Sequence, residues 1–231
     1  MSIRTIALIT TASLLAACSG AADTAEKVAS KTENTVKETV TKVAGPADAA
    51  VKTKGADMSA LPAGTYKSEQ GHAYIAFQYD HQGFSRPIIR WGTTDATVVF
   101  DADNPEKSSL TVRLPVADID TGVAKWDEHI KAPGFFDLAN HPEVTFVSTN
   151  INQIKDGYGK LTGDLTINGI TKPFTLTGTV NKVGKNFRSG VDMFGISATG
   201  SLKREDFGVD KYLPVGADVD IMVEVEFQKA Q

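Results

Sequence analysis

The only cysteine of the chain, Cys18, is the residue whose position most directly indicates chemistry. It follows the run Leu15-Ala16-Ala17, which ends an apolar stretch over residues 6–17 that comes after the positive charge of Arg4. This order is typical of a signal peptide whose cleavage site is made of small residues. We therefore expect cleavage before Cys18 and attachment of a diacylglycerol to its sulfur, which would anchor the mature chain to a membrane.

The alternative interpretation is an ordinary cleaved signal peptide followed by a cysteine with no special role. If Cys18 is lipidated, the next residue bears on the destination of the protein. An Asp there would resemble the inner-membrane retention signal of bacterial lipoproteins, but the chain has Ser19. The sequence therefore predicts a periplasmic, lipid-anchored protein, with the outer membrane favoured.

Four histidines could ligate a metal ion, because three imidazoles suffice for a catalytic zinc. Their spacing does not favour this: His72 and His81 are nine residues apart beside one predicted strand, so they would lie on opposite faces, and no H-E-x-x-H motif is present. We expect hydrogen-bonded structural roles for all of them. These residues are His72, His81, His129 and His141.

Other catalytic patterns are also weak. The chain has no G-x-S-x-G turn for a serine nucleophile, and acidic pairs such as Asp118 and Asp120 fall in predicted loops, where solvated charge is the usual explanation. With 24 Lys and Arg against 28 Asp and Glu and a net charge of −4, no basic field for nucleic acid is expected. The sequence therefore predicts no catalytic residue, no metal, no cofactor and no nucleic-acid partner.

After the predicted signal peptide at 1–17, the chain divides into two segments of different composition. Residues 18–60 contain no aromatic residue, no Leu and no Ile, so we expect a disordered or weakly helical tether. Every aromatic residue of the chain lies in 61–231, which is the predicted folded domain. Nothing beyond the signal peptide approaches the length of a membrane-spanning helix.

Strict alternation of apolar and polar residues indicates half-buried β-strands in this domain. One example is residues 160–167, in which Leu161, Leu165 and Ile167 share a face, and another is residues 218–227. Asn168-Gly169 is typical of a tight hairpin turn, and residues 124–130 predict a short helix before a Pro-Gly stop. About eight or nine such strands predict an all-β fold, a single antiparallel sheet curled into a barrel.

The interior of such a barrel either holds a small ligand or is filled by side chains. Glycines on apolar faces, such as Gly163 and Gly178, favour room inside, although bulges or bends would explain them equally well. The candidate ligand-binding residues are the apolar side chains expected to face this lumen. They are Phe77, Tyr79, Phe84, Trp91, Phe100, Leu114, Phe146, Leu165, Ile167, Phe174 and Leu176.

Four ordered motifs resemble the YceI-like, polyisoprenoid-binding proteins of bacteria. The resemblance covers about Leu61 to Phe227, with Glu69 where Asp is usual and "RPIIRWG" in place of the common Gly-x-Phe. The motifs are "GTYKSEQGHAYIAFQYDHQGFS", "WDEHIKAPGFFDLANHPEVTFVST", "LTGDLTINGITKPFTL" and "ISATGSLKREDFGV".

This resemblance implies a lipocalin-like barrel that takes up a long isoprenoid, such as a quinone tail or a polyprenyl phosphate, for periplasmic carriage, storage or sensing. Two alternatives stay open: a non-binding structural or stress-response module, and an enzyme that acts on a lipid inside the barrel. The expected partners are the isoprenoid lipid and the membrane, reached through the acyl anchor. A homodimer is left open.

Overall fold

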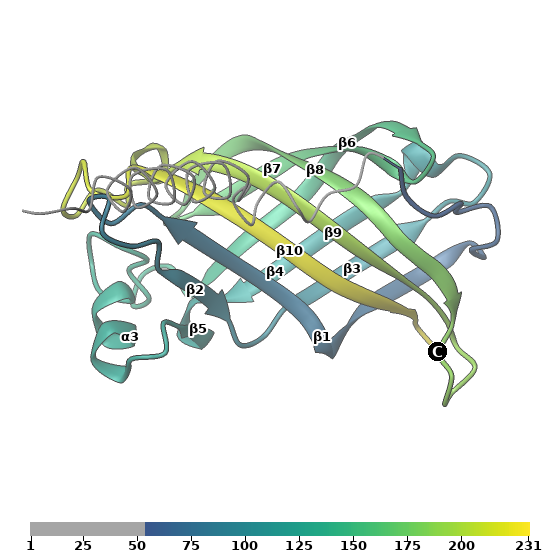
Figure 1. The fold of residues 1–231 in the computed structure, drawn as a ribbon, viewed down its shortest axis with the longest axis horizontal. Helices are drawn as coiled ribbons and strands as arrows, with labels where there is room; N and C mark the ends of the chain where they lie inside the picture. The colour runs from purple at the N-terminus through teal and green to yellow at the C-terminus, as the bar shows by residue number, and fades with distance from the viewer. Residues whose placement is uncertain (1–53) are drawn as a thin grey trace, which may run out of the picture. The chain divides into compact units, whose positions relative to one another are not determined.

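The computed structural model describes residues 54–231, whose strands form one antiparallel sheet that closes on itself (Figure 1). Cys18 and most of the predicted tether lie outside the described residues. The strands are β1 Gly64–Tyr79, β2 Ile88–Trp91, β3 Asp95–Phe100, β4 Ser109–Pro115, β5 Ile119–Asp120, β6 Glu143–Lys155, β7 Tyr158–Ile167, β8 Ile170–Lys185, β9 Asp192–Lys203 and β10 Asp218–Lys229.

The sheet order is β10-β9-β8-β7-β6-β4-β3-β1-β2-β5, and a further pairing of β10 with β1 closes the barrel. Eight strands form the wall, because β2 and β5 continue the lines of β3 and β4 beyond short breaks. β1 pairs with β3 through residues 64–67 and with β2 through residues 76–78. The prediction of an antiparallel barrel of about eight strands is confirmed.

Local turn chemistry also follows the sequence. Asn168-Gly169 joins β7 to β8 with φ values of 51° and 72°, and Asp156-Gly157 joins β6 to β7 with 52° and 67°. Positive φ at both central residues is what a two-residue hairpin requires, and Asn, Asp and Gly tolerate it. The predicted helix is α3, Ala124–Ile130.

The barrel has two unlike ends, which we name by their residues. The α3 end carries α3, the β7–β8 hairpin and the loop 204–217. The Gly64 end carries the start of β1, the β3–β4 connection with the 3-10 helix Pro105–Lys107, the β6–β7 and β8–β9 hairpins, and the end of β10. Figure 1 shows the helix at one extremity and the C-terminus at the other.

Aromatic rings fill the barrel toward the α3 end. Phe77 packs at 5.4 Å from Trp91 and 5.9 Å from Phe136, measured between ring centroids. Trp126 of α3 packs on Phe135 at 5.8 Å. This half of the interior is a close-packed core.

Arg204 organises the loop that covers this end. It begins the 3-10 helix Arg204–Phe207, and its guanidinium donates hydrogen bonds to the carbonyl oxygens of four residues of the loop. Burial lowers the pKa of this guanidinium. The acceptors are Val209, Lys211, Val215 and Gly216, at 2.5 to 2.9 Å.

Residues 54–60, which are predicted to belong to the tether, contact the barrel. The backbone N–H of Gly55 donates to the carbonyl of Asp156 at 2.6 Å, and that of Ala56 donates to Val180 at 2.7 Å. Met58 packs against the core. No helix among the described residues has both the length and the hydropathy that crossing a membrane requires.

Candidate functional site

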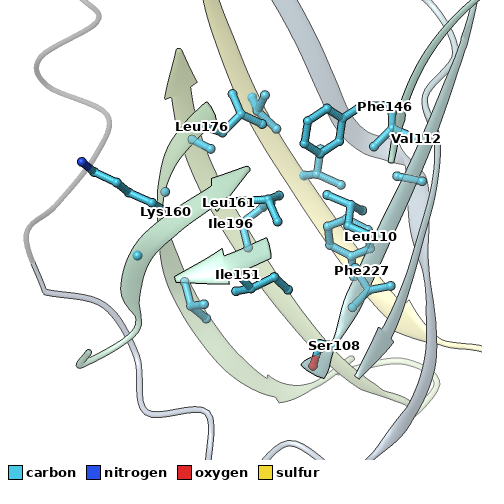
Figure 2. A pocket seen from close by; sticks show the side chains of 18 of the residues that line it. Ser108, Leu110, Val112, Phe146, Ile151, Lys160, Leu161, Leu176, Ile196 and Phe227 are labelled. Carbon is cyan, nitrogen blue, oxygen red and sulfur yellow. The ribbon is translucent and has the colours of Figure 1, made fainter. Parts of the chain in front are cut away.

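An apolar cavity of about 220 Å³ occupies the interior toward the Gly64 end. Its lining extends along β7 from Tyr158 to Leu165, roughly 23 Å of strand at 3.3 Å per residue. The space is therefore elongated along the barrel rather than round. Figure 2 shows two facing walls, with Leu161, Leu176 and Ile196 on one and Leu110, Phe146 and Phe227 on the other.

The walls offer hydrocarbon because inward residues alternate with outward ones along every strand. The few polar side chains of the lining include Ser108 and Thr145, and Ser108 already accepts a hydrogen bond from the backbone of Asp101 at 3.0 Å. The ammonium of Lys160 points away from the cavity in Figure 2. The cavity can therefore solvate an apolar chain but offers little to a buried charge.

The cavity opens between loops at the Gly64 end. The loop residues of its lining all belong to this end: Pro105 and Ser108 from the β3–β4 connection, Gly157 from the β6–β7 hairpin and Met58 from the N-terminal segment. We call this ring of residues the mouth. Gly157 permits the close approach of the N-terminal segment, because a Cβ there would overlap the backbone of Ala56.

Six of the eleven predicted lumen residues line the cavity. Four others are placed in the packed half: Phe77 and Trp91 in the aromatic cluster, and Tyr79 and Ile167 near the α3 end of their strands. Their side chains are inward as predicted, but other side chains occupy the space they face. The six that line the cavity are Phe100, Leu114, Phe146, Leu165, Phe174 and Leu176.

The prediction for Phe84 is wrong. It was predicted to face the lumen, but it is 86% exposed, in the turn between β1 and β2. The backbone N–H of Phe84 donates to the carbonyl of His81 at 3.0 Å, so the chain has already turned out of the strand there. The strand alternation that motivated the prediction ends at Tyr79.

The prediction that glycines leave room inside the barrel is wrong at Gly163 but not at Gly178. A Cβ at Gly163 would overlap the ring of Phe146, and one at Gly178 would meet the Cβ of Ala198 at 3.2 Å. Gly163 therefore leaves no empty space beside it, whereas Gly178 is one of the residues that line the cavity. At Gly163 the missing side chain makes room for the ring of Phe146, which itself lines the cavity.

Sequence reasoning missed several lining residues. Leu161, Ile196 and Phe227 line the cavity from β7, β9 and β10, and the alternation of their strands would have found them. Met58 could not have been found in this way, because it precedes the first strand and its position depends on the hydrogen bonds of Gly55 and Ala56.

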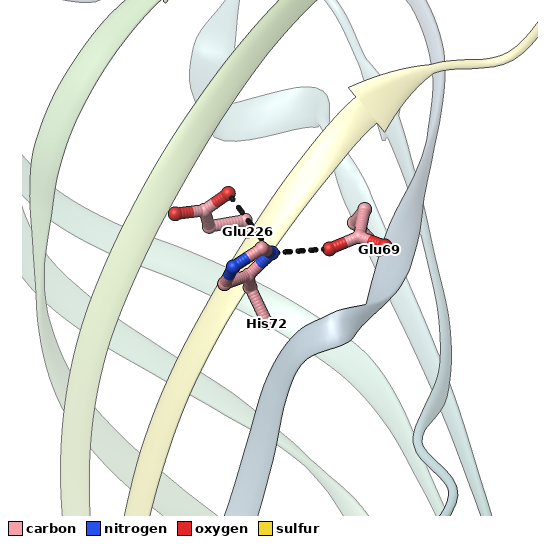
Figure 3. A group of neighbouring side chains, drawn as sticks. All are labelled: Glu69, His72 and Glu226. Carbon is pink, nitrogen blue, oxygen red and sulfur yellow. Dashed lines mark hydrogen bonds and ion pairs between the residues drawn. The ribbon is translucent and has the colours of Figure 1, made fainter. Parts of the chain in front are cut away.

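A polar group on the outside of the barrel involves one of the four histidines (Figure 3). A bulge in β1 between Ser68 and Ala73 brings His72 beside Glu69 and opposite Glu226 of β10. The Nδ1 of His72 lies 2.5 Å from a Glu69 carboxylate oxygen and 3.8 Å from one of Glu226.

The hydrogen bond with Glu69, followed by the charge of Glu226, raises the pKa of His72. The same hydrogen bond lowers the pKa of Glu69. Potential ligand atoms of the three side chains lie within 4.8 Å of one another, the geometry a small cation would need. His72 is largely exposed, however, and an ion pair accounts for the arrangement, so the absence of a metal stays a prediction.

Comparisons with known proteins agree with this architecture. A UPF0312 protein of Ectopseudomonas mendocina is 35% identical over 156 residues, 67% of this chain and 81% of that protein. The crystal structure of Burkholderia cenocepacia BcnA superposes with a TM-score of 0.62 at 21% identity, covering 69% of this chain and 98% of that one.

A polyisoprenoid binding domain from Saccharophagus degradans, implicated in plant cell wall breakdown, shares the fold with a TM-score of 0.55 at 8% identity, covering 73% of this chain and 100% of that one. The family model for the YceI-like domain matches residues 66–227, from the first residues of β1 to the end of the cavity lining on β10. The chain therefore belongs to the YceI-like family.

Proposed function

We propose that this protein binds the hydrocarbon chain of an isoprenoid lipid, such as a quinone tail or a polyprenyl phosphate, inside the barrel. The observation that carries the proposal is the elongated cavity with apolar walls and an opening at the Gly64 end. The polyisoprenoid-binding domain with the same fold supports the choice of ligand class.

The energetics favour such a ligand. Each isoprenoid unit has five carbons, and burial at about 0.8 kcal/mol per carbon gives up to about 4 kcal/mol per unit before ordering costs. A chain with a few buried units therefore partitions strongly out of water without any polar contact. A headgroup would remain at the mouth, where loops and solvent surround it.

The cavity also bears on the two alternatives. A purely structural module would be expected to fill its interior throughout, as the aromatic cluster around Phe77 and Phe136 does at the other end. An enzyme acting on a lipid would need a nucleophile, acid or base facing the chain, whereas the described lining is dominated by Leu, Ile, Val and Phe. We therefore propose a binding protein rather than an enzyme.

We further propose that the protein works in the periplasm, tethered by a lipidated Cys18 and favouring the outer membrane. The support is the sequence run before Cys18 and the residue after it. A tethered barrel would carry, store or sense isoprenoids that cannot cross the aqueous periplasm unprotected.

The direct test is mass spectrometry of organic extracts from protein purified without detergent. We expect an isoprenoid in stoichiometric amount, and uptake of a short-tailed quinone by protein stripped of lipid. An extract without isoprenoid, together with no uptake of the short-tailed quinone, would contradict the proposal.

A further inference from the structure

The tip of the β8–β9 hairpin carries an aromatic side chain that the fold holds out into solvent. Phe187 is 89% exposed, the most exposed large apolar side chain among the described residues. The turn is ordered: the side-chain oxygen of Asn186 accepts hydrogen bonds from the backbone N–H groups of Arg188 at 2.9 Å and Ser189 at 3.1 Å. Exposure of Phe187 is therefore a consequence of defined turn geometry.

The same tip is cationic. The guanidinium of Arg188 lies 5.3 Å from the centre of the Phe187 ring, and Lys182 and Lys185 precede them at the end of β8. Lys185 pairs with Asp192 at 2.6 Å, whereas Lys182 and Arg188 make no ion pair within residues 54–231. An exposed aromatic ring beside unpaired cations is the combination that favours the interface of an anionic bilayer.

The tip lies at the same end as the mouth of the cavity. Val180 of β8 and Phe194 and Ile196 of β9 line the cavity, and the same two strands continue to the tip. The hairpin also extends past the β6–β7 turn, because β7 pairs with β8 only as far as Thr179. Figure 1 shows this hairpin beside the C-terminus, at the extremity opposite α3.

We propose that the β8–β9 tip docks on an anionic lipid surface, with Phe187 inserted among the headgroups and Arg188 and Lys182 above them. Docking holds the mouth against the bilayer, so that an apolar chain passes from membrane to cavity without being exposed to water. This inference rests on the proposed function, because it supplies the route by which the ligand enters.

A tryptophan reporter tests insertion directly. Phe187→Trp is made in the chain that begins at residue 18 and carries Cys18→Ser, so that neither the signal peptide nor an acyl chain supplies the binding, and is mixed with phosphatidylglycerol-containing vesicles that hold brominated lipids. We expect a blue shift and quenching of the added emission with these vesicles and much less with phosphatidylcholine alone. Removing one charge by Arg188→Gln should weaken partitioning roughly fivefold.

The chain offers a matched control. Phe84 is nearly as exposed as Phe187, but it lies in the turn after β1, which is at the α3 end of the barrel. Phe84→Trp in the same background should show no quenching. Equal quenching of both reporters, quenching of the Phe84 reporter alone, or quenching of neither would overturn the proposal.

A second measurement separates docking from ligand binding. Phe187→Ala should bind a short-tailed, water-soluble quinone as the parent does, but should extract a long-chain quinone from anionic vesicles at least tenfold more slowly. If the parent binds no quinone, the proposed function fails while the insertion result still stands. If Phe187→Ala extracts at the parent rate, docking by this tip is refuted even though binding is retained.

Discussion

Enlarging a residue of the cavity wall should stabilise the protein and block its ligand. Leu161 faces the cavity from β7, and Leu161→Phe adds three side-chain carbons to that space. At about 0.8 kcal/mol per buried carbon the gain is at most about 2.4 kcal/mol. Imperfect fit and the ordering of the larger ring reduce it to about 1.5 kcal/mol. For a domain of this size that corresponds to a rise in Tm of about 3 to 6 °C.

Ile167 provides the matched control on the same strand and the same face. Ile167→Phe also adds three carbons, but Ile167 is buried in the packed half of the interior and is not among the residues that line the cavity. Forcing extra carbons into a close-packed core costs about 1 to 3 kcal/mol. The two substitutions should therefore change the free energy of unfolding with opposite signs.

Urea unfolding of lipid-free protein, followed by circular dichroism, measures both changes. Quinone uptake measured in parallel should fall at least tenfold for Leu161→Phe, because the ring occupies space that the ligand needs. If Leu161→Phe destabilises the protein as much as Ile167→Phe does, the lumen is close-packed in solution. The assignment of this cavity as a ligand site would then be wrong.

Three further outcomes are expected. Cys18→Ser should abolish acylation and release the protein from the membrane fraction of cells, as checked by fractionation and mass spectrometry. In an NMR titration His72 should have a pKa above its ordinary value of about 6.5, and Glu69→Gln should lower it. The ion pair then stabilises the fold fully between about pH 4.5, the ordinary pKa of Glu69, and about pH 6.5, and this stabilisation is lost as the pH rises through the raised pKa of His72 or falls through the lowered pKa of Glu69. Arg204→Met should lower the free energy of unfolding measured in urea by about 2 to 3 kcal/mol, because four loop carbonyls lose their donor. These predictions would be contradicted, in turn, by acylation of Cys18→Ser protein, by an unshifted pKa of His72, or by an unchanged urea midpoint for Arg204→Met.

Much of the architecture follows from local patterns. The alternation along residues 160–167 predicted β7 with its correct inward face, and Asn168-Gly169 predicted the hairpin after it. Residues 124–130 predicted α3 with the observed bounds. These features depend on neighbours in sequence, since side-chain alternation and positive φ at a turn are decided within a few residues.

The position of the ligand cavity does not follow from such patterns. Leu165 and Ile167 are two residues apart on one inward face, yet Leu165 lines the cavity and Ile167 lies in the packed half. The rings of Phe77, Trp91 and Phe136 come from separate segments of the chain and meet only after the barrel closes.

The sequence by itself determined the long strands, the Asn168-Gly169 turn, the helix and the apolar character of the inner faces, because each of these is a local property of the chain. Tertiary structure decided which part of the interior is filled and which is open, and it brought Met58 to the mouth and left Phe84 outside. The physical reason is that empty space is the difference between the volume enclosed by the closed sheet and the volume of the side chains that meet inside it.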